Sequence, residues 1–489
     1  MTDRSSSDAR PNIVFILTDD HAAHAISAYG SRVNSTPQID RLAADGARLD
    51  SCYCTNAVCA PSRATILSGT YSHLNGVATI YDETDYRVPN FTECLRRTGY
   101  RTALFGKWHM GHRPGSLPRS RDFDAWQVFP GQGEYNDPVM INSSGEHTVT
   151  GYATNIVTDL SLDWLDGELQ RDQGEPFCLM IHHKAPHRPW VPDPKHTDLY
   201  PVGSIPEPET LFDDYATRSR AAHEATMRVA DNLDENDIKE PIPAELAGEE
   251  HRVERTRWFY QRYMRDYLQT IQSVDDNVGR VLDYLDEHGL SDNTIVVYTS
   301  DQGFFLGDHG WYDKRFIYDE SLQMPFLIRW PGRIAAGSRV EEIITNADFA
   351  ATFLEACGLD AEKVLPTSQG RSALGVLTGQ PPADWPQSMY YRYWEHDDVN
   401  HHAWAHYGVR TPTHKLVYFY NAGLGATGAS DNIFPAEWEL YDLVADPREL
   451  NNVADNPAYA GIRAELEAEL ERLQKHYRDE PYRPDLPVS

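Results

Sequence analysis

The sequence predicts an α/β protein with a doubly wound, mainly parallel sheet and a smaller C-terminal α+β subdomain. Three observations support this fold class. Continuous apolar runs alternate with amphipathic helical segments over most of the chain, which is typical of parallel strands buried on both faces. The 489 residues exceed the size of one ordinary core. The pattern then changes near residue 366, so we expect one domain over 1–365 and a second over 366–489.

Four apolar runs predict the central strands of the large sheet. They cover residues 12–17, 101–105, 177–181 and 294–299. Polar residues follow each run directly: Asp19 and Asp20, Lys107 and His109, His187, and Asp301 and Gln302. Because the carboxyl ends of parallel strands meet at one edge of a sheet, we expect these groups to form a single site.

Helical periodicity and turn residues predict the elements between and after these strands. Helices are expected over 37–45, 91–98, 152–166, 257–288 and 348–356, and a further strand over 324–330. Residues 200–256 are acidic and contain several prolines, which predicts an insertion over the sheet edge with a helix over about 213–230. The C-terminal subdomain is expected to hold an antiparallel sheet and one helix, from strands over 388–394, 415–420 and 437–442 and a helix over 458–476.

Composition limits the partners of the chain. The formal net charge of −30 argues against binding to nucleic acid or to an anionic membrane surface, so an anionic substrate would need a local positive pocket. The six cysteines show no metal-ligand spacing and are expected to be free thiols.

No apolar leader is apparent near the first residues, which predicts a cytoplasmic location. The composition leaves the oligomeric state open.

A stretch around Cys59 predicts a loop that enters a helix. In residues 59–69, CAPSRATILSG, Cys59 lies just outside the helix, Pro61 suits the first helical position, and Arg63 lies in the first turn. Unpaired backbone N–H groups, the helix dipole and the guanidinium would all favour an anion near Cys59, or a nucleophile that attacks one. Taken alone, Cys59 would be interpreted as a small buried residue before a helix, and the spacing of the other fixed residues in 59–69 reverses that interpretation.

The acidic residues indicate a metal site. Three neighbouring carboxylates repel one another unless a cation neutralises them or some stay protonated. Asp19, Asp20, Asp301 and the amide oxygen of Gln302 form an all-oxygen ligand set, which suits Ca²⁺ first and Mg²⁺ second. Taken alone, Asp19 and Asp20 could also be a solvated turn.

The chain resembles the type I sulfatase family. The resemblance depends on the Cys59 stretch, the Asp19-Asp20 pair, and the motifs GKWH at 106–109, APH at 185–187 and SDQG at 300–303. Within the family the chain looks most like carbohydrate sulfatases of the N-acetylglucosamine-6-sulfatase or mucin-desulfating kind, through residues 300–311 and 406–411. The resemblance implies an alkaline-phosphatase-like catalytic domain and the hydrolysis of sulfate monoesters, with a small sulfated sugar as substrate.

The resemblance also implies a nucleophile made from Cys59. The formylglycine-generating enzyme would oxidise Cys59 to formylglycine, whose hydrate attacks sulfur and also binds the metal. Arg63 would hold this group, and Asp301, itself a metal ligand, would take the proton of the attacking hydroxyl. His109 would take the proton of the second hydroxyl when sulfate is expelled.

Further residues would bind the substrate. Lys107, Lys314 and His187 would bind the sulfate oxygens, and either Lys314 or His187 would protonate the leaving alcohol. His401 and His406 are candidate substrate contacts, because residues 390–406 are dense in aromatic and histidine side chains. The alternative for this segment is a packed β subdomain with aromatic cross-strand pairs.

Two rival functions remain open at this stage. One is a phosphonate or phosphate ester hydrolase of the same superfamily, which Ser62 and Gln302 argue against. The other is a non-catalytic binder of sulfated glycans, which becomes the better interpretation if Cys59 stays unmodified.

Overall fold

A ten-stranded sheet forms the centre of the molecule. The structure is a computed structural model that describes residues 10–171 and 174–483. The strand order is β11-β2-β10-β9-β1-β8-β4-β5-β6-β7. The strands are β1 (Asn12–Thr18), β2 (Ala47–Leu49), β4 (Arg101–Lys107), β5 (Ala125–Phe129), β6 (Val139–Asn142), β7 (Gly145–Thr148), β8 (Phe177–His182), β9 (Thr294–Ser300), β10 (Phe326–Arg329) and β11 (Ser338–Val340).

The four strands predicted from apolar runs are neighbours in this sheet and run parallel. Ile16 of β1 pairs with Ile181 of β8 on one side and with Tyr298 of β9 on the other, and β8 in turn pairs with β4. Strand β10 lies antiparallel beside β9. Their carboxyl ends therefore share one edge, which confirms the predicted fold class and positions the site.

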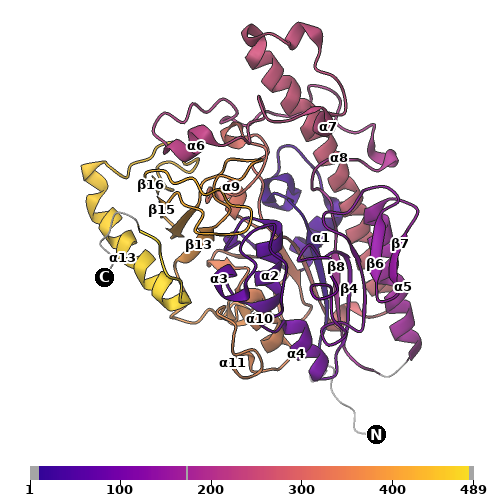
Figure 1. Cartoon of the computed structure of the whole chain (residues 1–489). Helices are drawn as coiled ribbons and strands as arrows, with labels where there is room; N and C mark the ends of the chain where they lie inside the picture. Colours follow the sequence, from indigo (N-terminus) through magenta and orange to yellow (C-terminus); the bar gives the residue numbers. More distant parts are fainter. Residues whose placement is uncertain (1–9, 172–173, 484–489) are drawn as a thin grey trace.

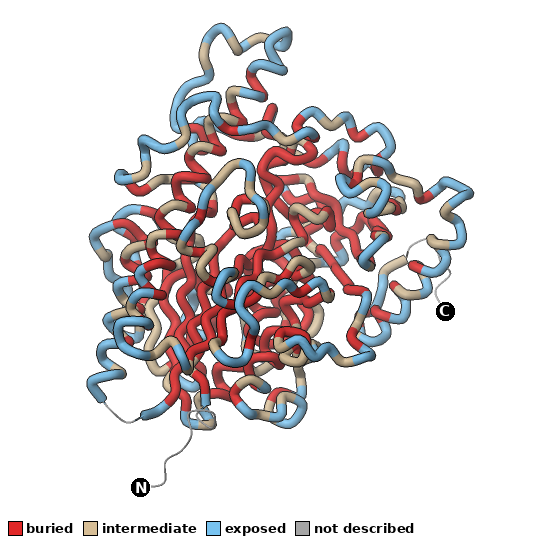
Figure 2. Tube along the Cα trace, turned by 180° about the vertical axis from the view of Figure 1, so that it is seen from behind, coloured by how far each residue is buried: buried red, intermediate tan, exposed pale blue. Residues whose placement is uncertain are grey.

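Helices cover both faces of the sheet (Figure 1). Side chains alternate along β1, so Phe15 packs on one face while Val14 and Ile16 pack on the other. The Phe15 face packs against α2 (Cys59–Ser68), α4 (Phe91–Arg97) and α10 (Asp348–Ala356). The opposite face packs against α1 (Pro37–Asp45), α5 (Ala153–Arg171) and the long α8 (Arg252–Glu287). Figure 2 shows the resulting buried centre and the exposed outer loops.

A second sheet of four antiparallel strands follows, in the order β13-β14-β15-β16. Its strands are β13 (Met389–Tyr393), β14 (His406–Arg410), β15 (His414–Phe419) and β16 (Glu437–Asp442). One face packs against α13 (Ala460–Tyr477) through Leu466, Leu470 and Leu473. The other face, which includes Tyr391 and Phe419, belongs to the same hydrophobic cluster as α2. The predicted α+β subdomain is thus confirmed as a fold, whereas the domain boundary at 365/366 stays a prediction.

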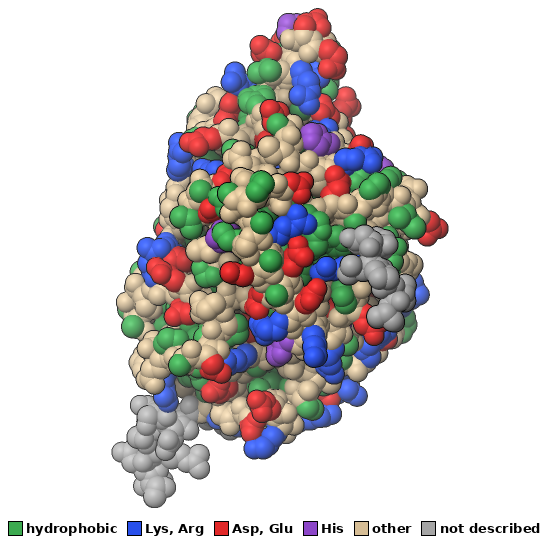
Figure 3. All heavy atoms as spheres, turned by 90° about the vertical axis from the view of Figure 1, so that its left-hand side faces the viewer, with side chains coloured by type: hydrophobic (Ala, Val, Ile, Leu, Met, Phe, Trp, Pro, Cys, Tyr) green, Lys and Arg blue, Asp and Glu red, His purple; other side chains and the backbone are tan. Residues whose placement is uncertain are grey.

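The remaining elements are short. They are β3 (Cys52–Tyr53), β12 (Ile344–Thr345), α3 (Ser72–Asn75), α6 (Arg220–Glu224), α7 (Glu235–Ile238), α9 (Asp319–Leu322), α11 (Ala361–Val364) and α12 (Leu374–Leu377). Eight 3₁₀ turns complete the described residues, from η2 (Ala23–Ala25) to η9 (Pro457–Tyr459). No helix in the described part of the chain is both long and apolar enough to span a membrane. On the face seen in Figure 3, acidic and basic side chains are interspersed.

The helix predicted over 213–230 is wrong. Only α6 forms there, and the chain turns extended at Ala225. The Asp213 carboxylate accepts the backbone N–H of Tyr215 at 3.0 Å, and Asn232 accepts that of Arg228 at 2.8 Å. Such side-chain bonds satisfy the backbone in turns and so compete with a helix. The segment is held by tertiary contacts instead, since Leu211 packs in a cluster with the first half of α8.

Candidate active site

The polar residues predicted at the strand ends meet at one edge of the large sheet. Asp19 and Asp20 follow β1, Lys107 ends β4, His187 lies in the loop after β8, and Asp301 and Gln302 follow β9. Helix α2 presents its first residue, Cys59, to the same edge. Nearly all of these side chains are buried, so the site is enclosed by the protein.

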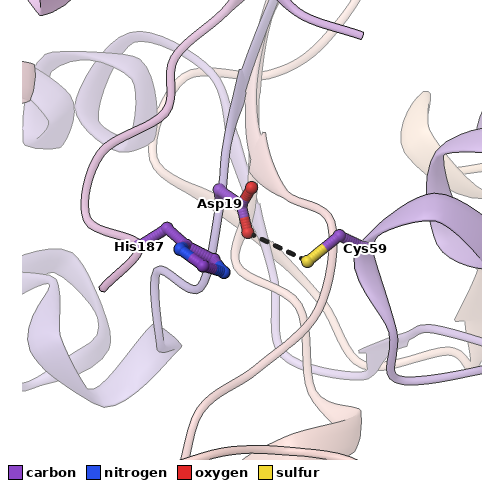
Figure 4. Close-up of side chains that lie close together, drawn as sticks. All are labelled: Asp19, Cys59 and His187. Carbon is purple, nitrogen blue, oxygen red and sulfur yellow. Dashed lines mark hydrogen bonds between the residues drawn. The ribbon is translucent and has the colours of Figure 1, made fainter. Parts of the chain in front are cut away.

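Cys59 lies at the centre of this group. Helix α2 begins at Cys59 itself, with Val58 as the residue before it, so the helix starts two residues earlier than predicted. The thiol donates to Asp19 Oδ1 at 3.2 Å. Figure 4 shows the sulfur of Cys59 and the ring of His187 both turned toward Asp19. Burial raises the pKa of the Cys59 thiol to about 12, so an unmodified thiol is a poor nucleophile here.

Three carboxylates crowd one point of the site. One oxygen each of Asp19, Asp20 and Asp301 lie within 4.8 Å of one another, and all three residues are fully buried. Burial raises the pKa of the Asp20 carboxyl to about 6, although the Lys314 ammonium opposes that rise. The Oε1 atom of Gln302 is buried beside them and has no hydrogen-bond partner among the described residues. Three carboxylates and the free amide oxygen of Gln302 form an all-oxygen set that fits a bound cation.

Basic side chains surround the carboxylates. The Arg63 guanidinium donates to Asp301 Oδ2 at 2.9 Å and to the carbonyl of Lys107 at 2.8 Å, which fixes its position. The Lys107 ammonium contacts Asp19. The Lys314 ammonium lies 2.8 Å from Asp20 Oδ1. The site therefore combines fixed positive charge with a carboxylate cluster, as the sequence predicts.

Two histidines of the site are uncharged at neutral pH. His187 Nε2 lies 3.7 Å from Asp20 Oδ2, and burial together with Lys107, Lys314 and Lys184 holds the pKa of His187 well below its usual range. Burial and the same kind of positive neighbours lower the pKa of His109. His109 Nδ1 has no hydrogen-bond partner within the described structure. Strand β4 ends at Lys107 and His109 has a left-handed φ of 58°, so the alternation of side chains along the strand does not extend to His109.

The two predicted substrate contacts lie in different surroundings. His401 borders the site: its Nε2 atom is 3.6 Å from Asp313 Oδ2 and 3.4 Å from Arg315, the residues on either side of Lys314. His406 is fully buried, and its ring centroid lies 5.5 Å from that of Tyr391. The ring of His406 in β14 packs among aromatic side chains, which favours the packed-subdomain alternative, and its role as a substrate contact stays a prediction.

Sequence reasoning missed several polar residues of the site. Gln132 accepts from the Lys107 ammonium, and the loop before His187 contributes Lys184. Asp313 and Arg315 flank the predicted Lys314, and this position in the sequence could have identified both of them. No such position in the sequence identifies Gln132.

Comparison with known proteins identifies the family. The sequence profile of the sulfatase family matches residues 11–359, which carry every residue of the carboxylate cluster and its basic neighbours. The chain belongs to the sulfatase family. A second profile, that of the C-terminal part of N-sulphoglucosamine sulphohydrolase, is similar to residues 307–476 of this sulfatase. The predicted activity, hydrolysis of sulfate esters, is thereby confirmed.

Individual relatives of this sulfatase agree with the narrower resemblance. The chain is 41% identical to an N-acetylglucosamine-6-O-sulfatase of Bacteroides thetaiotaomicron, over 96% of this chain and 87% of the relative. A solved structure of a relative in complex with its substrate D-glucosamine-2-N,6-O-disulfate superposes with a TM-score of 0.86 at 40% identity, covering 96% of this chain and 98% of the other. A phosphonate monoester hydrolase of Agrobacterium radiobacter, 22% identical with a TM-score of 0.70 over 96% of each chain, shares the fold. The roles of single residues stay predictions.

Proposed function

We propose that this sulfatase removes the 6-O-sulfate of a glucosamine-type sugar, with formylglycine at position 59 and a bound Ca²⁺. One observation carries the mechanism: the Cys59 side chain meets a three-carboxylate cluster and several ammonium groups at one sheet edge. The choice of sugar is supported by the relatives, one an N-acetylglucosamine-6-O-sulfatase and one bound to a glucosamine disulfate.

The proposed metal ligands are Asp19, Asp20, Asp301, the Oε1 atom of Gln302 and the modified side chain of residue 59. Fully buried carboxylates this close together need positive charge, and Gln302 Oε1 is an acceptor without a donor. Ca²⁺ suits these oxygen ligands, with Mg²⁺ as second choice. When bound, the ion would neutralise the carboxylates and polarise oxygen atoms near sulfur.

The proposed nucleophile is formylglycine and not the thiol, because burial raises the pKa of the Cys59 thiol to about 12 and so disfavours the reactive thiolate. Conversion by a formylglycine-generating enzyme supplies an aldehyde hydrate with two hydroxyl groups, one to attack sulfur and one to release sulfate afterwards. Asp301 accepts the proton of the first hydroxyl, and Arg63 holds that carboxylate in place through its 2.9 Å hydrogen bond. The unpartnered Nδ1 of His109 is free to accept the proton of the second.

Lys107, Lys314 and His187 are proposed to bind the sulfate oxygens. The two ammonium groups are buried and held at Asp19 and Asp20, so their charge is concentrated where the sulfate would lie. Lys314 and His187 both flank Asp20 and are the two candidates to protonate the leaving alcohol. Lys314 is the proposed donor, because the lowered pKa of His187 leaves its ring uncharged and its Nδ1 proton is bonded to the carbonyl of Arg188.

The sugar is proposed to bind beside Lys314. There the Arg315 guanidinium donates to the hydroxyl of Tyr393 at 3.0 Å and lies 3.4 Å from Glu395, and His401 reaches Asp313. A group of charged and polar side chains on one side of a sulfate site can bond to sugar hydroxyls and so select the sugar. His401, Asp313 and Arg315 are the proposed contacts.

A substrate screen tests the proposal. We expect turnover of N-acetylglucosamine 6-sulfate and of glucosamine 2-N,6-O-disulfate at the 6-position, faster turnover of 4-nitrophenyl sulfate than of its phosphate and phosphonate analogues, and none with Cys59→Ala. Faster turnover of the phosphonate would overturn the proposal. The peptide around residue 59 should weigh about 18 Da less than its thiol form, because formylglycine carries oxygen in place of SH₂. An unmodified peptide in the mature protein would favour a non-catalytic sulfated-glycan binder.

A further inference from the structure

Lys184 is a buried ammonium with few partners. It lies in the loop after β8, three residues before His187, and is only 3% exposed. Its Nζ atom donates to the carbonyl of Arg188 at 3.5 Å and lies 5.0 Å from the centroid of the Tyr135 ring. Among the residues that the structure describes, no carboxylate forms an ion pair with it. Burial accordingly lowers the pKa of Lys184 to about 8.

The other two buried lysines of the site each have a carboxylate partner, although burial also lowers the pKa of Lys107. Lys107 contacts Asp19, and Lys314 lies 2.8 Å from Asp20. A buried charge costs several kcal/mol unless an opposite charge or several hydrogen bonds compensate it. One weak hydrogen bond and one aromatic ring do not compensate the ammonium of Lys184. An anionic ligand bound beside Lys184 would supply the opposite charge that the described residues do not provide.

The Lys184 ammonium lies beside the ring of His187, because Lys184 Nζ and His187 Nδ1 both donate to the carbonyl of Arg188. Burial, together with the charges of Lys107, Lys314 and Lys184, lowers the pKa of His187 and of His109. The Tyr135 hydroxyl donates to the carbonyl of His187 at 2.7 Å, which ties the ring under Lys184 to this loop. In Figure 4, His187 reaches from the loop toward Asp19 and Cys59. Lys184 therefore lies on the His187 side of the site.

We infer that Lys184 binds the transferred sulfate group, as a third ammonium beside Lys107 and Lys314. The inference rests on the proposed function, because it takes the sulfate position from that assignment. A chain with a net charge of −30 does not attract a sulfate ester from a distance, so the cations inside the site supply the attraction. The unpaired ammonium of Lys184 does this more effectively than one already neutralised by a carboxylate.

Sulfate affinity tests this role without turnover. In a Cys59→Ala background loaded with Ca²⁺, the Kd of inorganic sulfate is measured by calorimetry with and without Lys184→Met. We expect the Kd to rise about 10-fold or more, the usual worth of a charge-assisted hydrogen bond. Lys184→Arg, which keeps the charge, should stay within a few-fold of the parent. Lys195→Met is the matched control, because Lys195 is a half-exposed lysine paired with Asp276 and its loss should leave the Kd unchanged.

The melting temperatures of the Lys184 variants show whether Lys184 binds sulfate or is needed for folding. Removing an uncompensated buried charge should leave the melting temperature of Lys184→Met unchanged or raise it, while a lysine needed for folding would lower it. Lys184→Gln gives the same comparison with a polar side chain. An unchanged sulfate Kd in a folded Lys184→Met protein, or a lower melting temperature in both variants with an unchanged Kd, overturns the inference.

Turnover by the converted enzyme distinguishes which anion is bound. We expect Lys184→Met to lower kcat/KM by the same factor, about 10- to 100-fold, for glucosamine 6-sulfate and for glucosamine 2-N,6-O-disulfate. A loss confined to the disulfate would assign Lys184 to the second sulfate and overturn the inference. If the wild type hydrolyses no sulfate ester yet Lys184→Met weakens sulfate binding, the proposed function fails and the role of Lys184 in anion binding stands.

Discussion

Two clusters of charged side chains in this molecule contain similar residue types but have different roles. The first is the active-site cluster of Asp19, Asp20, Asp301 and their basic neighbours. The second, here called the interface cluster, joins the 200–256 segment, the 308–320 loop and the C-terminal sheet. It contains Asp213, Arg218, His309, Asp319, Glu320, Arg410, Lys415 and Glu449.

Asp319 and Asp20 illustrate the difference. Asp319 lies 2.8 Å from both Arg410 and Lys415, and despite its partial burial these two cations hold the pKa of its carboxyl well below the usual range. Asp20 has one close lysine, but burial, with Asp313 and Asp301 nearby, raises its pKa to about 6. The interface cluster is not compensated throughout, because burial raises the pKa of its Glu449 to about 7. The contrast therefore lies between Asp319, which two cations neutralise and which helps to hold the fold, and Asp20, which together with its neighbouring carboxylates favours a bound cation.

The largest expected effect is at the nucleophile. Cys59→Ala should lower kcat by at least about 1000-fold, because no other side chain can replace a lost nucleophile. Cys178→Ala, which removes a buried thiol from β8, should leave kcat within a few-fold and lower only the melting temperature. Equal losses of kcat in both variants would mean that position 59 has no special chemistry.

Asp20→Asn tests whether the active-site carboxylates need a bound cation. We expect kcat/KM to fall by about 100-fold or more as the metal site is weakened, with the free energy of unfolding of the metal-free protein unchanged or increased, since a poorly compensated charge is removed. Chelation of the wild type should abolish turnover, and Ca²⁺ should restore it better than Mg²⁺. Substantial destabilisation of the metal-free Asp20→Asn protein would mean that Asp20, like Asp319, stabilises the fold.

Lys415→Met makes the complementary test in the interface cluster. The Lys415 ammonium lies 2.8 Å from the partly exposed Asp319, which keeps Arg410, and 2.6 Å from the buried Glu449, so its removal leaves Glu449 short of a partner. We expect the free energy of unfolding to fall by about 3–5 kcal/mol, as measured in urea, with kcat per folded molecule nearly unchanged. A loss of kcat without a loss of stability would make this cluster part of the catalytic site.

The smallest effect is the pH dependence contributed by His309. Although burial opposes it, hydrogen bonding to Asp213 and Glu320 raises the pKa of His309 from 6.5 to about 9. A pKa raised by folding adds stability that is complete below the unfolded value of 6.5 and is lost as the pH rises through about 9. His309→Gln should therefore be less stable than the wild type by roughly 2–3 kcal/mol near pH 6, and the gap should close near pH 10. Urea unfolding at both values checks the sign, and a gap that widens with pH would refute it.

The sequence predicted the parallel centre and the site edge well for a physical reason. Strands buried on both faces, such as β1 and β9, must be apolar throughout, and parallel pairing brings their ends together whatever the loops do. The helix over 213–230 was mispredicted because local side-chain bonds from Asp213 and Asn232 outweighed helix propensity. The sequence could not show that His406 has aromatic neighbours, because the residues around it in β14 come from separate segments of the chain. Lys184 carries no sequence pattern that distinguishes it from an exposed loop lysine.

The shared packing of the C-terminal sheet has a practical consequence. Tyr391 and Phe419 lie in the same cluster as the helix that carries the nucleophile. A fragment ending at residue 365 would expose that apolar surface to water, and we expect it to aggregate rather than fold. Engineering of substrate range should therefore exchange the loops around Arg315 and His401 within an intact chain, and not graft the C-terminal piece of one enzyme onto the body of another.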